Sequence, residues 1–406
     1  MSIRIIIGKN FGDEGKGLAT DYFASKARKK SASCIVVRHN GGAQAGHTVD
    51  FPDKRFVFHQ LSSGSFRGAD TYWAQTFLPD LYKLEEETEA FRGICKNPPT
   101  IYAHPMCRCV YIDDVLVNMA LETFRGDQRH GSCGMGINEA VLRSAIPEYC
   151  LHLGKIVNIT ITELYDKLLK LRLEYLPQRL EALGLSYDQL GEYRDLLTDN
   201  NVLFNAAEQM HKAVRMINVV GDDVVRGYDN VIFEGAQGLL LDEDHLEFAP
   251  HLTSSKTDSD TPMKFLRNNM PDAIPEIVYV TRSYVTRHGA GPLPHECEWE
   301  PYGITVNDMT NVANDWQGFL RFAPHGTIEE FAAPPISDIK KHTQNYKVSY
   351  MVTHLNETQG SICSTVGKIP VKQWFELLSE QISVDGIYLS YTPYSDDICY
   401  IKATKE

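Results

Sequence analysis

Residues 5–17 read Ile5-Ile6-Ile7-Gly8-Lys9-Asn10-Phe11-Gly12-Asp13-Glu14-Gly15-Lys16-Gly17, and this stretch says most about the fold. The β-branched run predicts a buried strand, the glycines predict a turn, and a helix is expected to begin near Lys16. Such a unit binds anions, because backbone N–H groups and the helix dipole face the ligand. It differs from the standard phosphate loop, since Gly8 lies two residues too far from Lys16 and Gly17 replaces the magnesium-binding Ser or Thr.

An acidic pair, Asp13 and Glu14, lies inside this loop. A carboxylate would repel a phosphate unless it binds a metal ion or accepts a proton. The loop is therefore a candidate catalytic centre as well as a phosphate site.

The composition excludes several classes of protein. The 406 residues carry a formal net charge of −13, whereas proteins that bind nucleic acids or membrane surfaces are usually basic. No apolar run approaches the roughly 18 residues that span a bilayer, and residues 1–4 lack the features of a signal peptide. The nine scattered cysteines indicate reduced thiols. We therefore expect a soluble, cytoplasmic protein without nucleic-acid or membrane partners.

Strand and helix patterns alternate along most of the chain. Strands are expected at residues 34–37, 56–61, 101–104, 231–233, 276–280 and 348–352. This alternation predicts an α/β fold with a mainly parallel central sheet, helices on both faces and a P-loop-like first turn. From about residue 155 to 225 a helical insertion is expected, in which Pro177 divides one long helix into two. Without repeats or a linker, residues 1–406 are expected to form one elaborated domain.

Three further segments carry polar groups suited to a nucleotide. Residues 233–238 end a buried strand, where Gln237 offers both a donor and an acceptor to a base edge. Residues 252–257 combine hydroxyls with one lysine, and residues 286–292 place Arg287 before two glycines. Taken singly, each segment is also compatible with an ordinary turn or surface loop.

Read together, these segments resemble adenylosuccinate synthetases. Residues 12–17, 45–48, 233–238, 253–255 and 286–292 occur in the order found in that family. The resemblance is strong over about the first fifty residues and from 231 to 296, and poor elsewhere. It implies a ligase that joins L-aspartate to C6 of a 6-oxopurine nucleotide, after a nucleoside triphosphate has phosphorylated O6.

The same resemblance implies roles for individual residues. Asp13 matches the base that removes the N1 proton, and with the Gly46 carbonyl it would hold Mg²⁺. His47 matches the general acid, for which a pKa near neutrality is suited. Lys16 would neutralise triphosphate charge. The remaining nucleotide-binding residues implied are Gly12, Glu14, Gly15, Gly17, Gln44, Ser132, Arg143, Gln237, Thr253, Arg287 and Asn356.

Departures from the family concern substrate recognition. Asn356 stands where relatives carry the Asp that reads guanine, so ATP or dATP is expected to be favoured over GTP. The arginine-rich loop that holds aspartate is reduced, in residues 314–321, to Arg321. Ser132 replaces a threonine of the phosphate loop, and Arg143 is expected to reach a partner subunit's nucleotide. The base- and aspartate-binding part from about 297 to 406 is divergent.

Several alternatives stay open. The acceptor is IMP or dGMP, because the chain partly resembles phage-type relatives that form 2-amino-2′-deoxyadenylosuccinate. Loss of the arginine-rich loop also suits a catalytically inactive nucleotide-binding regulator of the same fold. A homodimer is implied by the family alone.

Overall fold

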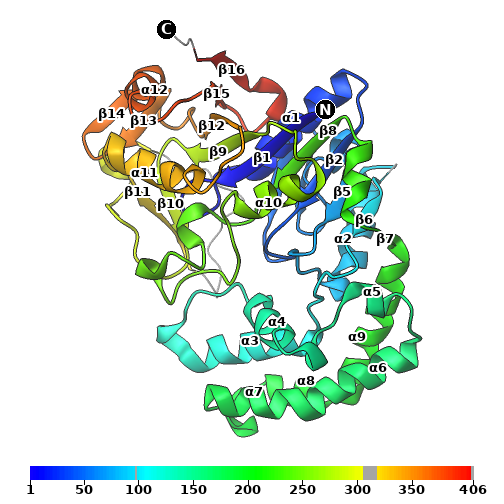
Figure 1. Cartoon of the computed structure of the whole chain (residues 1–406). Helices are drawn as coiled ribbons and strands as arrows, with labels where there is room; N and C mark the ends of the chain where they lie inside the picture. The colour runs from blue at the N-terminus through cyan, green and yellow to red at the C-terminus, as the bar shows by residue number, and fades with distance from the viewer. Residues whose placement is uncertain (97, 305–317, 404–406) are drawn as a thin grey trace.

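The computed structural model describes residues 1–96, 98–304 and 318–403. A ten-stranded sheet runs through this part of the chain in the order β16-β15-β12-β9-β1-β8-β2-β5-β6-β7 (Figure 1). Every neighbouring pair is parallel except β15 and β16. The strands are β1 (Ser2–Gly8), β2 (Cys34–Arg38), β5 (Asp70–Trp73), β6 (Ile101–Ala103), β7 (Ile217–Val219), β8 (Asn230–Glu234), β9 (Glu276–Arg282), β12 (Lys347–Thr353), β15 (Gly386–Leu389) and β16 (Cys399–Lys402).

Helices cover both faces of the sheet, as predicted. They are α1 (Lys16–Lys29), α2 (Leu81–Ile94), α3 (Ile112–Arg125), α4 (Ile137–Ser144), α5 (Leu153–Ile156), α6 (Ile161–Lys170), α7 (Leu176–Leu183), α8 (Tyr193–Thr198), α9 (Asn200–Ala213), α10 (Asp260–Asn269), α11 (Ile328–Ile339) and α12 (Val371–Ser379). Figure 1 shows α3, α4 and α6–α9 gathered at the end of the molecule away from both termini. None of the described helices is both long and apolar enough to cross a membrane.

The central strand β1 explains why the opening sequence is β-branched throughout. Ile5 and Ile7 belong to the core shared with α10, α11 and α12, whereas Ile6 belongs to the core under α1. All three side chains are fully buried, and burial of each contributes about 1.5–3 kcal/mol. A parallel strand covered on both faces needs apolar residues at every position.

Two expectations about local structure hold only in part: the strand expected at 56–61 lies at 54–58, and Pro177 lies at the start of a second helix, α7. Residues 54–58 form β4, which pairs only with β3 (His47–Phe51) in an antiparallel hairpin outside the main sheet. Pro177 does not divide a helix in two, because a π-helical segment at Leu171–Tyr175 joins α6 directly to α7. A wider turn ahead of the proline accommodates a residue that lacks an N–H donor.

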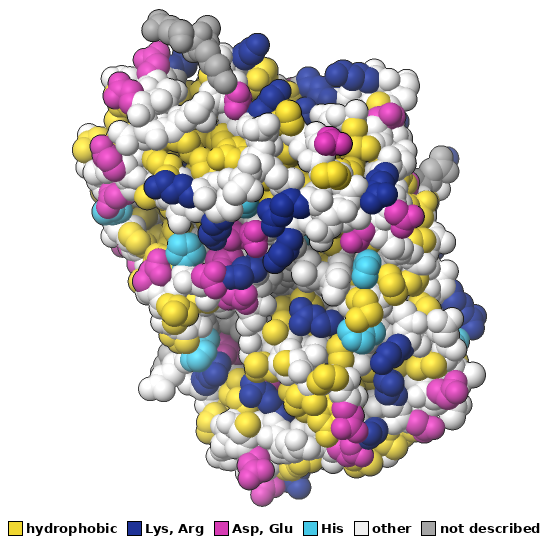
Figure 2. All heavy atoms as spheres, in the orientation of Figure 1, with side chains coloured by type: hydrophobic (Ala, Val, Ile, Leu, Met, Phe, Trp, Pro, Cys, Tyr) yellow, Lys and Arg dark blue, Asp and Glu magenta, His cyan; other side chains and the backbone are white. Residues whose placement is uncertain are grey.

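Two further hairpins lie beside the sheet. They are β10 (Val285–His288) with β11 (Leu320–Ala323), and β13 (Ser361–Ser364) with β14 (Gly367–Pro370). On the face shown in Figure 2, acidic and basic side chains are interspersed rather than gathered into one basic patch.

A buried ion pair joins α3 to α4. Arg143 donates from Nε and Nη2 to Asp114, at 2.9 and 2.7 Å, and from Nη1 and Nη2 to the carbonyls of Tyr149 and Cys109. The two charged side chains are 0% and 2% exposed. Their charges balance each other only while both are present.

Replacing Arg143 by Met is expected to lower the free energy of unfolding by about 3–5 kcal/mol, because the Asp114 carboxylate is then buried without a partner. Denaturant unfolding monitored by circular dichroism measures this loss. Arg194→Gln, which breaks an exposed pair with Asp188, is the control and should cost less than about 1 kcal/mol. Equal small losses in both variants would contradict this account of the pair.

Candidate active site

A cavity of about 970 Å³ opens where β1, β2, β8, β9 and β12 end. Ligands of open α/β sheets bind at this carboxyl edge. Its walls come from the phosphate loop with the start of α1 (residues 11–18), residues 44–50, the segment after α3 (residues 130–139), residues 250–254, residues 353–357 and residues 390–393. Segments far apart in the sequence therefore meet at one place.

The two acids of the loop have different positions. Glu14 is buried, its Oε1 accepts from the backbone N–H groups of Asn10 and Gly12 at 2.8 and 3.0 Å, and its Oε2 lies 3.3 Å from Lys16 Nζ. It does not line the cavity, so its expected contact with the nucleotide stays a prediction, and the contacts observed are with the loop itself. Asp13 is exposed in the cavity wall.

Asp13 is held there by its backbone. Its φ of 60° is left-handed, which is uncommon for a residue with a side chain. The Asp13 carbonyl accepts from Arg282 Nε at 2.7 Å. In the described part of the chain no group donates to the Asp13 carboxylate, so this carboxylate is available to a proton or a metal ion.

The start of α1 provides the anion site predicted from the sequence. Gly15 has a φ of 99° and the helix begins at Lys16 without a side-chain cap, so its first N–H groups are left to a ligand. Gly15, Lys16 and Gly17 all line the cavity, with Gly12 beside them. Gly12, Gly15, Lys16 and Gly17 therefore all lie in the cavity wall.

His47 is backed by a second buried acid. Its Nδ1 lies 2.9 Å from Glu234 Oε1, with the side chains 6% and 0% exposed. Neither Nδ1 nor Nε2 of His47 has a hydrogen bond of good geometry in the described structure, so the close contact with Glu234 is an ion-pair distance that a small rotation of the ring would align. An Nδ1–H directed at a carboxylate fixes the tautomer and leaves Nε2 to act on a ligand in the cavity.

Burial and neighbouring charges shift the pKa values of both His47 and Glu234. Burial lowers the pKa of His47 to about 4, and Glu234 opposes that fall. Burial alone would raise the pKa of Glu234, but His47 and Arg38 outweigh it and lower this pKa to about 2. Glu234 therefore stays ionised and favours protonation of His47.

Two amides and two hydroxyl groups also line the cavity. Both polar atoms of the Gln44 amide are buried without partners, and Gln237 takes a left-handed φ of 64° in the turn after β8. Thr253 donates its N–H to the Leu241 carbonyl, which leaves its hydroxyl to a ligand. Ser132 donates its hydroxyl to Asn118 Oδ1 at 2.9 Å.

The residues present fit a magnesium ion. No cluster of three or more His, Cys, Asp or Glu side chains suited to a metal occurs among the described residues. Mg²⁺ commonly takes one or two protein ligands and completes its shell with phosphate and water oxygens. Asp13 and the exposed Gly46 both line the cavity and can supply such ligands.

Two of the predicted arginines, Arg143 and Arg321, do not line the cavity. Arg143, expected to reach a partner subunit's nucleotide, is fully buried in this chain and bound to Asp114. Arg321 is paired with Glu296 and donates to the carbonyls of Gly289 and Gly291. It does not line the cavity in this structure, so its part in holding aspartate stays a prediction.

Arg287 does line the cavity, next to Phe11, whose ring centroid lies 4.6 Å from its guanidinium carbon. Asn356 is exposed at the other end of the wall, near Ser390, Thr392 and Pro393. Residues 314–317 of the reduced arginine loop lie outside the described residues.

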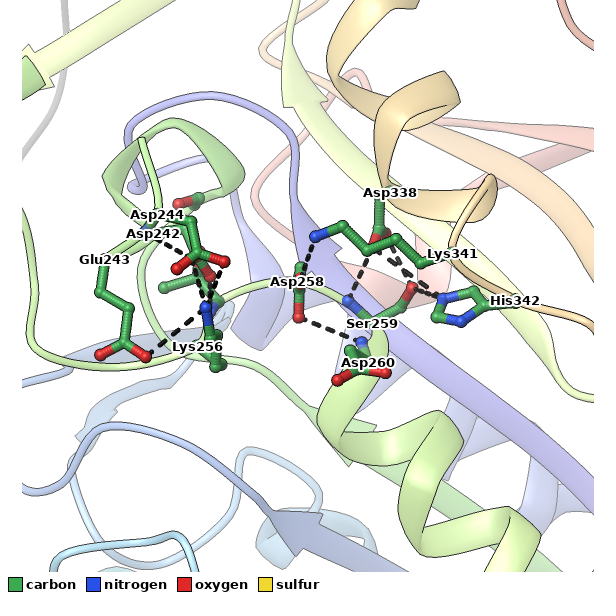
Figure 3. A network of polar contacts seen from close by, with 12 residues as sticks. Asp242, Glu243, Asp244, Lys256, Asp258, Ser259, Asp260, Asp338, Lys341 and His342 are labelled. Carbon is green, nitrogen blue, oxygen red and sulfur yellow. Dashed lines mark hydrogen bonds and ion pairs between the residues drawn. The ribbon is translucent and has the colours of Figure 1, made fainter. Parts of the chain in front are cut away.

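Lys256 is not available for a phosphate. Figure 3 shows its ammonium group between Asp242, Glu243 and Asp244, and these contacts raise its pKa to about 12 against the effect of burial. In the same figure, Asp258 binds Lys341, and Ser259 donates to Asp338 at 2.8 Å. This network fixes the segment after Thr253.

Sequence reasoning missed several residues that shape the site. Glu234 was part of a recognised motif, and its position at the end of a buried strand could have indicated a partner for a buried base. Glu122, which accepts from the N–H groups of Gly131 and Ser132 at 3.1 and 3.2 Å, gave no local signal because its partners lie nine and ten residues away. Arg282 likewise contacts the loop only through the fold.

Comparisons with known proteins agree on one family. The family model of adenylosuccinate synthetase matches residues 5–316. An adenylosuccinate synthetase of Azobacteroides pseudotrichonymphae is 29% identical over 317 residues, which cover 78% of this chain and 70% of that protein. One from Desulforamulus reducens is 30% identical over 307 residues, which cover 73% and 65%.

Solved structures share the fold. The fully ligated adenylosuccinate synthetase from Plasmodium falciparum has a TM-score of 0.69 at 17% identity and covers 99% of this chain and 100% of its own. The succinoaminodeoxyadenylate synthetase of cyanophage S-2L, bound to dGMP and dATP, has a TM-score of 0.63 at 16% identity, over 98% and 95%. Because the family model matches most of the chain, from the phosphate loop to residue 316, this protein belongs to the adenylosuccinate synthetase family of ligases, which form a C–N bond.

Proposed function

We propose that this ligase joins L-aspartate to C6 of IMP or dGMP, with ATP or dATP favoured over GTP as phosphoryl donor. One observation carries the proposal: the Asp13 carboxylate and His47, whose Nε2 has no partner, belong to the same cavity wall as Lys16 and the start of α1. A base, an acid and an anion site are what phosphorylation of a purine oxygen requires.

Each residue has a distinct task in this scheme. Asp13 accepts the N1 proton of the purine, so that electron density moves to O6. O6 attacks the γ-phosphorus, and the nucleoside diphosphate leaves. His47, held by Glu234, hydrogen-bonds O6, while Lys16 and the N–H groups of α1 neutralise phosphate charge. The aspartate amine then displaces phosphate from C6.

Magnesium belongs to the proposal. Asp13 and the Gly46 carbonyl would hold Mg²⁺, which when bound neutralises charge on the transferring phosphoryl group. The Asp13 carboxylate lines the cavity and accepts no hydrogen bond from residues 1–96, 98–304 or 318–403, which supports this assignment.

The choice of donor rests on Asn356. Its amide both donates and accepts, so it does not offer guanine the two acceptor oxygens of a carboxylate. His354, two residues earlier, adopts a left-handed φ of 59° that sets the direction of the segment. The cyanophage structural relative, which binds dGMP with dATP as energy donor, supports including dGMP and dATP among the substrates.

The assembly and the acidic substrate are also inferred. We propose a cytoplasmic homodimer, as in the family, formed by one elaborated domain with a helical insertion at about 155–225 and a divergent substrate-binding part at about 297–406. Since Arg321 is bound to Glu296, aspartate must be held by groups other than this side chain in its observed position.

Replacing Asp13 by Asn should lower kcat by about 10²–10⁴-fold, since a positioned base contributes that much. The melting temperature should not change, because the carboxylate makes no hydrogen bond or ion pair with any described residue. Release of phosphate during turnover measures the rate. Asp166→Asn, an exposed residue of α6, is the control. An unchanged nucleotide-dependent function in the Asp13 variant would favour a catalytically inactive regulator.

Replacing Glu234 by Gln should move the loss of activity with rising pH to lower pH, by about one unit. The sign follows because Glu234 raises the pKa of His47, and a general acid works only while protonated. Profiles of kcat against pH test this, with thermal unfolding measured alongside. Glu247→Gln breaks a comparable pair with His245 outside the cavity and should leave the profile in place. A Glu234 variant with the wild-type profile would refute the assignment.

Replacing Asn356 by Asp should raise the preference for GTP over ATP by about tenfold or more, because a carboxylate accepts two hydrogen bonds from guanine. The measurement is kcat/KM with ATP, dATP and GTP, each with IMP, GMP and dGMP as acceptor. Asn158→Asp, on the surface, is the control. A wild-type enzyme that strongly prefers GTP would disprove the role given to Asn356.

A further inference from the structure

One arginine joins helix α1 to the C-terminal part of the chain. Arg67 ends the 3₁₀ turn η1 (Ser65–Arg67), which follows the β3–β4 hairpin. It donates from Nε and Nη2 to the carboxylate of Asp21 in α1, at 3.0 and 2.9 Å, and the Asp21 side chain is fully buried. A bidentate pair of this kind fixes the direction of both side chains.

The same guanidinium contacts another 3₁₀ turn, η11 (Ser395–Asp397). Its Nη2 donates to Ser395 Oγ and to Asp396 Oδ2, both at 3.0 Å. The Ser395 hydroxyl in turn donates to Asp21. Two further side chains of α1 bind the other oxygen of Asp396, Ser25 at 3.0 Å and Lys29 at 2.8 Å. Turn η11 is therefore attached to α1 at several points, although the two are distant in the sequence.

Turn η11 also holds the part of the cavity wall that lies just before it in the sequence. Asp397 Oδ2 accepts from the Thr392 hydroxyl at 2.8 Å, and the Tyr394 N–H donates to the oxygen of that hydroxyl at 3.2 Å. The Ser390 hydroxyl donates to the Thr392 carbonyl at 2.7 Å. Because Ser390, Thr392 and Pro393 line the cavity, the position of η11 determines the position of this wall.

This wall adjoins the segment that carries Asn356. Residues 354–357 follow β12 and residues 390–393 follow β15, and these two strands are parallel neighbours in the sheet. The Leu355 N–H donates to the Ser390 carbonyl at 3.2 Å. Residues 354–357 and 390–393 therefore form one surface, here named the base wall, since the proposed function places the donor purine at Asn356.

Helix α1 carries the other end of the donor. In the proposed function its start binds the triphosphate through Lys16 and the first N–H groups. Asp21 lies five residues further on, about 7.5 Å along the helix axis. Neither Asp21 nor Arg67 lines the cavity. Both residues connect the phosphate-binding helix to the base wall from behind, so they can act on a ligand only by positioning the groups that contact it.

We propose that Arg67, held by Asp21, is a positioning residue for the donor triphosphate, because it fixes the base wall relative to the start of α1. A preorganised site binds a long ligand more tightly, since less freedom is lost when both ends of the ligand are engaged. The inference rests on the proposed function, because it assigns the donor base to the base wall. It adds a residue outside the cavity that controls affinity for the nucleotide.

The test is calorimetric binding to the whole chain with Mg²⁺ and without acceptor or aspartate. The probes are ATP and inorganic tripolyphosphate, which lacks the base and the ribose. Arg67→Gln should lose about tenfold in affinity for ATP, since a hydrogen bond to a charged group is worth about that much. Its affinity for tripolyphosphate should change by less than about twofold. Arg67→Lys should recover part of the loss for ATP.

Asp397→Ala is the second variant, because it keeps the buried pair of Asp21 and Arg67 and removes only the acceptor of the Thr392 hydroxyl. It should lose about three- to tenfold in affinity for ATP alone. In turnover, both variants should raise KM for ATP and leave kcat at saturating ATP within about twofold of the wild type. A variant that is only less stable would lose kcat instead. Thermal unfolding shows whether each variant is folded.

Arg28→Gln is the matched control, because Arg28 is an exposed residue of α1 that donates to the Phe66 carbonyl next to Arg67. It should bind both probes like the wild type. Equal losses for ATP and tripolyphosphate in Arg67→Gln would place its effect at the start of α1 and overturn the proposal. Wild-type affinity for ATP in Arg67→Gln or in Asp397→Ala would also overturn it. A wild-type chain that binds ATP with this dependence on Arg67 but forms no product would refute the proposed function and leave the link between α1 and the base wall standing.

Discussion

The site depends on the burial of one carboxylate. Glu14 accepts from the N–H groups of Asn10 and Gly12 and lies beside Lys16, so it closes the phosphate loop around its own side chain. A Cβ at Gly8 would lie 2.4 Å from Glu14 Oε2, which explains why glycine is needed there. With Glu14 turned inward, the left-handed turn at Asp13 presents the neighbouring carboxylate to the cavity. One buried acid thereby positions one exposed acid.

A similar division of tasks holds at His47. Glu234 is buried, ionised and close to His47 Nδ1, and it contacts no ligand because it does not line the cavity. In the proposed function Asp13 accepts a proton, whereas Glu234 favours the protonated form of its neighbour His47. Acid and base chemistry can then proceed at the same pH, because the two carboxylates differ in solvation and in their partners.

Local patterns predicted the parts of the molecule that local chemistry determines. The β-branched run, the glycines and Lys16 specify strand, loop and helix start within seventeen residues, and the parallel sheet follows from alternating patterns. The positions of the other site residues depend on side chains that are distant in the sequence, which local patterns do not indicate. Arg143 resembles a ligand-binding arginine in sequence, but Asp114 lies 29 positions away and buries it. Arg321 is captured by Glu296, and Pro177 is accommodated by a π-helical turn, neither of which any local pattern indicates.

The dependence on distant partners also explains how residues for substrate recognition can differ between relatives while the residues around the phosphate loop are kept. Asp13 lies in the loop after β1, Lys16 at the start of α1 and His47 at the start of β3. Lys16 is held by Glu14, and His47 lies against Glu234. The phosphate and base neighbourhoods come from loops after α3, β8, β10 and β12, which join the site only through the fold. Arg287 illustrates the consequence. A buried guanidinium close to the like charge of Arg321, with no acidic partner among the described residues, costs stability. Its hydrogen bonds to the carbonyls of His251 and Pro292 and its contact with the Phe11 ring offset part of that cost, so loops that meet only through the fold keep this charge in the cavity wall.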